Sequence, residues 1–284
     1  MKNFFISIGK AACYALLLLA VQFIVGSVYI YAVMFAQLIK DGVNLASFDA
    51  STIDALTENV TETTLASQNM IYLISAVLII GILILFFRMR SKRLDRETWA
   101  MPIKISSLWP VVVLGVFFSL FICYVVAIIP WPEWAIDSYD ELYAATNDFS
   151  AVAFITTVIA APILEEIVYR GLVFTRLCRG MPAPAAAILA SVVFAAMHGT
   201  LVWMAYAFVG SMMLIFVYTK YRSLYASILF HILFNLVGGF LILLIPQYGA
   251  GFDRMLMLAS FVLTVLTVFI IVKMPREKID KIAQ

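Results

Sequence analysis

The chain contains long uninterrupted apolar stretches, and these constrain its fold more than any other feature of the sequence. A helix needs about 20 apolar residues to cross the hydrocarbon core of a bilayer. Only 13% of the 284 residues are charged, against about a quarter in soluble domains. We therefore predict an all-α fold, a polytopic bundle of about eight transmembrane helices. The predicted helices are residues 7–37, 69–87, 108–129, 150–174, 183–199, 201–219, 224–245 and 254–273.

The segments between these stretches contain no recognisable soluble domain. The longest polar segment, about Lys40 to Gln68, is predicted to be a loop. The first apolar stretch is too long for the core of a cleavable signal sequence, so we expect it to remain as a membrane helix. The three cysteines lie far apart, without metal-binding or disulfide spacing, and we expect them to pack as apolar residues. They are Cys13, Cys123 and Cys178.

The charges at the helix ends predict the orientation, because short cytoplasmic loops carry an excess of Lys and Arg. With eight helices, one side receives Arg88, Arg90, Lys92, Arg93, Arg96, Lys104, Arg176, Arg179, Lys220, Arg222, Lys273, Arg276, Lys278 and Lys281. The other side receives Asp41, Asp49, Asp54, Glu58, Glu62, Glu133, Asp137, Asp140, Glu141 and Asp148. We therefore predict a multi-pass protein of the cytoplasmic (plasma) membrane with both termini cytoplasmic. A net charge of +2 indicates no nucleic-acid partner.

The fourth apolar stretch is unusual because it carries charge, in the sequence LEEIVYRGL. Ionisable groups at this depth cost at least about 2.5 kcal/mol and are candidates for function. Glu166 and Arg170 are four residues apart, which suits an ion pair within one helix. Glu165 points about 100° away, and Tyr169 can hydrogen-bond to it but cannot neutralise it. Glu165 is therefore predicted to be the free carboxylate; a buried polar latch between helices is the alternative interpretation.

Both histidines of the chain, His198 and His231, also lie in predicted membrane helices. Asn235 follows His231 by one helical turn and therefore projects from the same face. With Glu165, these residue types can deprotonate a water, hold it and donate hydrogen bonds to a developing oxyanion. The same types could also bind a divalent metal such as zinc. No GxSxG or HExxH motif is present, so the residues indicate neither a serine hydrolase nor a zinc site on a single helix.

The predicted depths of these residues do not agree. At about 1.5 Å per residue, Glu165 and His231 both lie in the inner half of the bilayer, whereas His198 comes out nearer the outer side. A single site requires that the helix predicted at 183–199 begins below the membrane surface, tilts strongly or stops short of the outer face.

Three motifs occur in order along the chain, namely EEIVYR, FAAMH and HILFN. The segment from about Ala161 to Gly238 thereby resembles the CPBP family of intramembrane proteases (CAAX proteases and bacteriocin-processing enzymes, also called Abi proteins), which includes the type II CAAX prenyl endopeptidases. The signature of that family is EExxxR, FxxxH and HxxxN on successive membrane helices. With this resemblance we divide the single membrane domain into N-terminal helices and loops (1–149), a catalytic core (150–245), and the last helix with a basic tail (246–284).

The resemblance also implies roles for individual residues. Glu165 is expected to activate the attacking water with His198, while His231 and Asn235 stabilise the tetrahedral oxyanion. Supporting positions are Glu166, Tyr169, Arg170 and Phe194. The family is often labelled a metalloprotease, and a bound metal would be held by Glu165, His198 and His231. A metal-independent glutamate mechanism fits the same residues. The site is expected to be accessible from the cytoplasm.

The leading hypothesis is an intramembrane endopeptidase that cleaves a substrate at the lipid bilayer. This substrate would be the CAAX-like C-terminus of a lipidated protein, or a hydrophobic peptide such as a bacteriocin or signal-peptide precursor. Two other classes remain open. One is a non-proteolytic immunity or scaffold protein that binds a peptide through the same cavity, and the other is a proton-coupled transporter that uses Glu165 as the relay.

Overall fold

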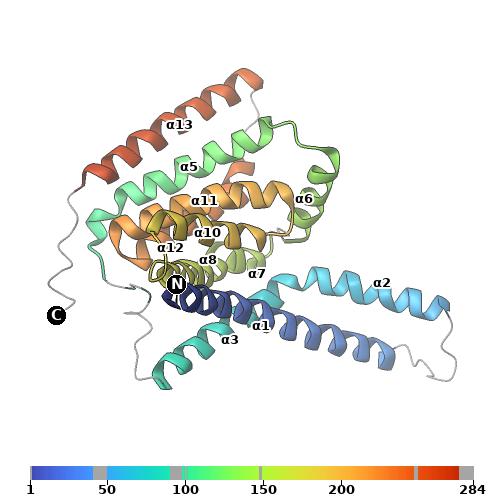
Figure 1. Ribbon diagram of the computed structural model, residues 1–284. Coiled ribbons are helices and arrows are strands. Elements are labelled where there is room, and N and C mark those ends of the chain that lie inside the picture. Colours follow the sequence, from blue (N-terminus) through green and yellow to red (C-terminus); the bar gives the residue numbers. More distant parts are fainter. Residues whose placement is uncertain are drawn as a thin grey trace.

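The computed structural model describes residues 2–40, 50–89, 98, 100, 102–146, 149–245 and 249–274. Every regular element in these ranges is a helix, which confirms the predicted all-α fold (Figure 1). The elements are α1 (Lys2–Lys40), α2 (Ala50–Ala66), α3 (Gln68–Met89), η2 (Ile105–Ser107), α5 (Trp109–Ile128), α6 (Glu133–Thr146), α7 (Ala151–Phe154), η3 (Ile155–Ala160), α8 (Ala161–Glu165), η4 (Glu166–Phe174), α9 (Thr175–Leu177), α10 (Ala183–Ala196), α11 (Leu201–Tyr221), α12 (Leu224–Gly239), η5 (Leu241–Leu244) and α13 (Ala250–Lys273).

Six helices within the described ranges are long and apolar enough to cross a membrane. They are Asn3–Lys40, Gln68–Met89, Trp109–Ile128, Ala151–Leu177, Leu201–Tyr221 and Gly251–Lys273. The other two predicted spans, 183–199 and 224–245, correspond to the shorter apolar helices α10 and α12. The 14 residues of α10 cover only about 21 Å of a hydrocarbon core of about 30 Å. Length and composition thus support six crossings, and the count of eight stays a prediction.

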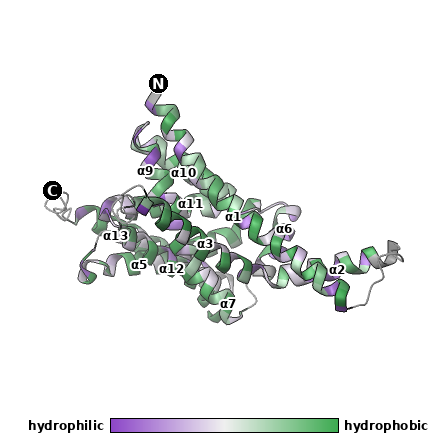
Figure 2. Cartoon of the chain, turned by 90° about the horizontal axis from the view of Figure 1, so that it is seen from below, coloured by the Kyte–Doolittle hydropathy of each residue, from purple (hydrophilic) through white to green (hydrophobic). Residues whose placement is uncertain are grey.

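The outward faces of these helices carry large apolar side chains. Phe23 and Val28 of α1, Val77 and Leu85 of α3, and Phe269 of α13 are all exposed. Figure 2 shows that hydrophobic residues run along most of the bundle helices. Exposed apolar area of this extent marks a surface that meets another apolar phase, here the lipid.

The segment predicted as a loop from Lys40 to Gln68 is largely helical, so that prediction was wrong. Helix α2 runs beside the second half of α1, and the two form a hairpin that projects from the bundle (Figure 1). The hydroxyl of Tyr29 in α1 donates to Ser67 Oγ at the base of this hairpin, at 2.6 Å. No glycine or proline interrupts residues 50–68, so the polar composition hid a continuous helix.

Several charged residues used to predict the orientation lie outside the described residues. They are Asp41, Asp49, Arg90, Lys92, Arg93, Arg96, Asp148, Arg276, Lys278 and Lys281. The basic residues of that set that the structure describes lie at other helix ends than the acidic helices α2 and α6. The orientation therefore stays a prediction from charge placement.

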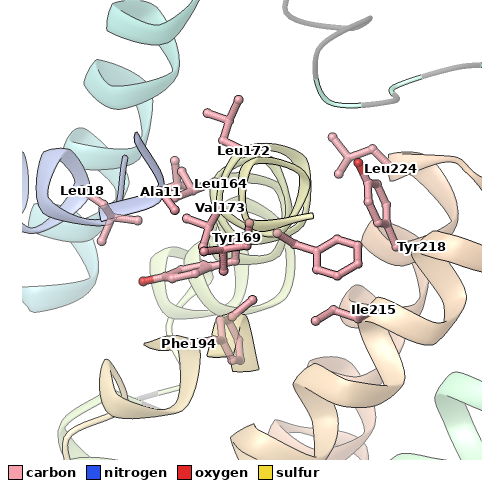
Figure 3. Close-up of a cluster of buried hydrophobic side chains, with 14 of the residues drawn as sticks. Ala11, Leu18, Leu164, Tyr169, Leu172, Val173, Phe194, Ile215, Tyr218 and Leu224 are labelled. Atoms are coloured by element: carbon pink, nitrogen blue, oxygen red, sulfur yellow. The ribbon is translucent and has the colours of Figure 1, made fainter. Parts of the chain in front are cut away.

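The helix from Ala151 to Leu177 lies at the centre of the larger core cluster. Figure 3 shows its residue Leu164 between Ala11 and Leu18 of α1 on one side and Tyr218 of α11 on the other. Leu164, Leu172 and Phe174 are almost completely buried. The charged sequence LEEIVYRGL is therefore enclosed by helices and does not face the lipid.

Two parts of this central helix, η3 and η4, are wound as π-helix. In η3 the N–H of Ala161 bonds to the carbonyl of Thr156, five residues earlier. The same pattern would next require an N–H at position 162, but Pro162 has none. The carbonyl of Thr157 consequently has no N–H at position 162 from which it could accept a hydrogen bond. π-Helical turns of this kind frequently occur at functional sites.

A close helix contact gives a test of the packing. A Cβ atom at Gly115 of α5 would lie 2.8 Å from Leu233 Cβ of α12, whereas one at Gly81 of α3 would have no neighbour within 4 Å. We predict that Gly115→Ala lowers the free energy of unfolding by about 1–3 kcal/mol through overpacking. Gly81→Ala should change it by no more than about 1 kcal/mol. Apparent melting temperatures of the detergent-purified variants measure this difference, and equal values would contradict the close approach.

Candidate active site

The predicted site residues gather around one cavity of about 410 Å³ inside the bundle. Its walls come from α1, α3, α6, the central helix, α10, α11 and α12. They comprise Leu18, Gln22, Gln68, Asn69, Ile71, Tyr72, Ser75, Leu142, Thr156, Thr157, Ala161, Glu165, Tyr169, Phe194, Met197, His198, Trp203, His231 and Asn235. All four residues expected to act on a substrate, Glu165, His198, His231 and Asn235, are among them.

Glu166 and Arg170 form the ion pair that their spacing predicts. Arg170 Nη1 lies 2.8 Å from Glu166 Oε1, and both side chains are fully buried. The same carboxylate oxygen lies 2.9 Å from His231 Nδ1. Because an ionised carboxylate can only accept, His231 carries a proton on Nδ1. Glu166 is thus occupied by two partners, and its task is to neutralise Arg170 and to orient His231.

Glu165 faces the cavity instead, with 17% of its side chain exposed. Its Oε1 accepts a hydrogen bond from the hydroxyl of Tyr72 in α3, at 3.0 Å. Its Oε2 lies 3.8 Å from His231 Nε2, which is too long for a direct hydrogen bond. The two adjacent glutamates therefore lie in different environments, as the helix spacing predicts.

His198 lies at the same cavity because α10 is short. The helix ends at Ala196, and a turn through Gly199, whose φ is +80°, leads directly into α11. The helix predicted at 183–199 therefore stops short, which is one of the three arrangements that would bring His198 to a single site. His198 Nδ1 lies 2.9 Å from the carbonyl oxygen of Phe194. Since a carbonyl only accepts, Nδ1 carries the proton and leaves Nε2 with its lone pair.

Asn235 is held by the irregular part of the central helix. Its Nδ2 donates to the carbonyl of Thr157 at 2.9 Å, the carbonyl that Pro162 leaves without a helical partner. The amide group has a second N–H on the same nitrogen. The π-helical turn therefore fixes the Asn235 side chain while one donor stays available to the cavity.

Phe194 and Tyr169 support this arrangement by packing. The Phe194 ring lies 4.3 Å from Arg170 Cζ, a cation–π contact. Its centroid is 4.7 Å from that of His198 and 6.1 Å from that of His231. The ring of Tyr169 meets Phe194 edge-on at 5.1 Å. Phe194 thus acts as a spacer between the arginine and both imidazoles.

The Tyr169 hydroxyl has no hydrogen-bond partner in the described part of the chain. The hydrogen bond from Tyr169 to Glu165 that the sequence allows is therefore not formed, and Tyr72 supplies it instead. Sequence reasoning also missed Thr157 and Trp203. For Thr157, the signal in the sequence was Pro162 inside an apolar helix. Tyr72 and Trp203 are single aromatic residues in apolar stretches, and nothing in the neighbouring sequence distinguishes them.

The cavity extends toward the acidic helix ends. Gln22 of α1, Gln68 at the start of α3 and Leu142 of α6 line it, whereas none of the described basic helix ends contributes a residue. Toward the basic end, the hydroxyl of Tyr218 donates to the carbonyl of Thr98 at 2.9 Å. The side of the membrane from which this cavity is reached stays a prediction.

The residues do not assemble a metal site. Glu165, His198 and His231 are suitable ligand types, but no three His, Cys, Asp or Glu side chains in the described ranges are grouped closely enough to hold a metal ion.

Comparison with known families gives a match over the same region. Residues 147–237 match the model described as "Rce1-like: Type II CAAX prenyl endopeptidase Rce1-like". Comparisons with curated proteins and with solved structures gave no match. The matched segment contains the central helix, α10, α11 and most of α12. The match and the six apolar helices together support an integral membrane protein that is similar, over residues 147–237, to a protease family.

The adjacent glutamates provide a matched pair of variants. Glu166→Gln removes the charge that neutralises buried Arg170, and we predict a loss of about 3–5 kcal/mol in the free energy of unfolding. Glu165→Gln keeps the oxygen that accepts from Tyr72 and removes no ion pair with arginine, so its loss should be below about 1 kcal/mol. Thermal unfolding in detergent compares the two. Equal destabilisation would contradict the division between an occupied and a free glutamate.

Proposed function

We propose that this chain, which carries an Rce1-like domain at residues 147–237, is an intramembrane endopeptidase that hydrolyses a peptide bond with a water activated by Glu165. The observation that carries the proposal is the difference between the two glutamates. Glu166 is fully buried and bound to Arg170 and His231, whereas Glu165 faces a cavity shared with two histidines and an asparagine.

The water is proposed to lie against Glu165 Oε2, in the cavity that this carboxylate shares with His198. As the water oxygen bonds to the substrate carbonyl carbon, Glu165 accepts its proton and the carbonyl electron pair moves to oxygen. His198 Nε2, which carries a lone pair, can accept a hydrogen bond from the other O–H of the water and thereby orient it. The intermediate then collapses: the carbon–nitrogen bond breaks, and the leaving amine takes the proton from Glu165.

The oxyanion is proposed to be stabilised by the second N–H of Asn235 and by His231. His231 already donates through Nδ1 to Glu166, so it can donate through Nε2 only as an imidazolium. Removing one oxyanion donor typically costs about 10²–10³ in rate.

The substrate is proposed to be a membrane-associated peptide, either the CAAX-like C-terminus of a lipidated protein or a hydrophobic bacteriocin or signal-peptide precursor. The family match supports the first class. The apolar walls and the buried polar cluster support both, because a peptide bond entering an apolar bundle needs polar partners for its N–H and C=O groups.

We further propose that the protein lies in the cytoplasmic membrane with both termini inside, and that substrate reaches Glu165 from the outer face. The orientation is supported by the Lys and Arg residues at one set of helix ends. The access is supported by the cavity walls at Gln68, the first residue of α3, and at Leu142 of the acidic helix α6.

The catalytic assignment predicts loss of cleavage without loss of the fold. Glu165→Gln and His198→Ala should each lower the cleavage rate by at least about 10²-fold, while Glu58→Gln on the projecting helix α2 should leave it unchanged. Mass spectrometry of membrane peptides from cells with and without each variant identifies the bond that is cut. Full cleavage by either site variant would exclude the proposed mechanism, and cleavage by neither wild type nor variants would exclude the proposed function.

Labelling with a membrane-impermeant maleimide tests from which side of the membrane the cavity is reached. In a background without native cysteines, Gln68→Cys should react in intact cells. A protein that keeps only native Cys178, exposed just beyond the central helix, should react only after the membrane is permeabilised. The reverse pattern would restore the cytoplasmic access expected from the family.

A further inference from the structure

A second cavity of about 320 Å³ lies beside the first, between α5, α6, α11 and α12. The two cavities share three lining residues, Thr157, Trp203 and Asn235. Trp203 stands between them, with its ring 5.7 Å from that of His198 on one side and 6.3 Å from that of Tyr139 on the other. The second cavity therefore begins at Asn235, the residue proposed to contact the carbonyl of the cleaved bond.

Aromatic rings form the wall of this cavity nearest α6. The ring of Tyr139 lies 5.9 Å from that of Tyr143 and 6.3 Å from that of Tyr206, and Trp203 completes the group. Burial raises the pKa of Tyr139 to about 12, so its phenol stays neutral at physiological pH. The π faces of neutral tyrosine and tryptophan attract cations.

The charge around the cavity is entirely negative. Asp140, which is exposed, lines it, and no lysine or arginine does so among the described residues. Helix α6 carries Glu133, Asp137, Asp140 and Glu141 and no basic residue. Asp140 makes no ion pair in the described part of the chain. A carboxylate beside several aromatic rings matches an organic ammonium or guanidinium group.

We propose that this second cavity binds a lysine or arginine side chain of the substrate peptide, at a position within two residues of the cleaved bond. The aliphatic stem packs against Ile122 and Val126, and the cationic head lies among the tyrosines beside Asp140. Asn235 lines both cavities, so the cationic side chain must lie close to the cleaved bond. An extended chain advances about 3.3 Å per residue, which gives the limit of two residues. This inference rests on the proposed function, which defines the bond.

A phospholipid head group is the other common source of an ammonium in a membrane. Its phosphate would lie within a few ångströms of its amine and therefore beside Asp140 and the other acidic residues of α6, without a lysine or arginine to neutralise it. Like charges at such a distance repel. A peptide side chain carries the cation without the phosphate, and the structure therefore favours it.

The experiment measures binding to the Glu165→Gln protein in detergent, so that hydrolysis does not enter. The probes are fluorescent apolar peptides in which one lysine, or its uncharged counterpart norleucine, is moved through the sequence. At one position or two neighbouring positions, the lysine peptide should bind about tenfold more tightly than the norleucine peptide. Adding Asp140→Asn should bring this ratio close to one, whereas the matched control Asp137→Asn, on the same helix but outside the cavity, should preserve it.

Three results would overturn the inference. These are a ratio near one at every position, a ratio that survives Asp140→Asn, and an acetyl-lysine peptide that binds as tightly as the lysine peptide. In nanodiscs, a lysine preference that is present in phosphatidylglycerol and lost in phosphatidylcholine would assign the cavity to a lipid ammonium instead. Because binding is read in a protein that cannot cleave, failure of the proposed peptidase activity would appear only in the separate cleavage assay.

Discussion

The site depends on one buried interaction, the carboxylate of Glu166 held between Arg170 and His231. It allows a positive charge to exist among apolar helices, because an unpaired arginine there would be strongly destabilising. The same carboxylate fixes the proton on His231 Nδ1 and turns Nε2 toward Glu165. Arg170 in turn lies on the face of Phe194, which contacts both imidazoles. One ion pair thereby sets the orientation of groups from three different helices.

A second constraint comes from the backbone of the central helix. In the interior of a regular α-helix, each carbonyl group accepts a hydrogen bond from an N–H of the same helix. The π-helical turn before Pro162 breaks that rule at Thr157, and Asn235 takes the released carbonyl as its anchor. The irregularity is confined to a position enclosed by other helices, as it must be where the lipid offers no hydrogen bonds. The irregular turn of the helix thus fixes a side chain at the site.

The sequence predicted those features that depend on composition or on spacing within one helix. Apolar runs located the six helices that are long enough to cross a membrane, and the four-residue spacing of Glu166 and Arg170 predicted their ion pair. Features that depend on contacts between distant segments were not accessible. Nothing near Tyr72 signals that its hydroxyl will meet Glu165, which lies 93 residues later. The helix α2 was missed because polarity was taken as the sign of a loop, although residues 50–68 contain neither glycine nor proline. The depth of His198 required the length of α10, whose end is set by the turn at Gly199.

The position of Tyr72 relative to the family match has a further consequence. The proposed catalytic residues lie within residues 147–237, but Gln22, Tyr72 and Leu142, which border the same cavity, lie before that segment. The proposed chemistry and part of the cavity wall are therefore encoded in different parts of the chain. Substitutions in the N-terminal helices can change that part of the wall while the proposed catalytic residues stay unchanged. Chimaeras that exchange residues 1–146 between related proteins would accordingly exchange substrate preference and keep the reaction.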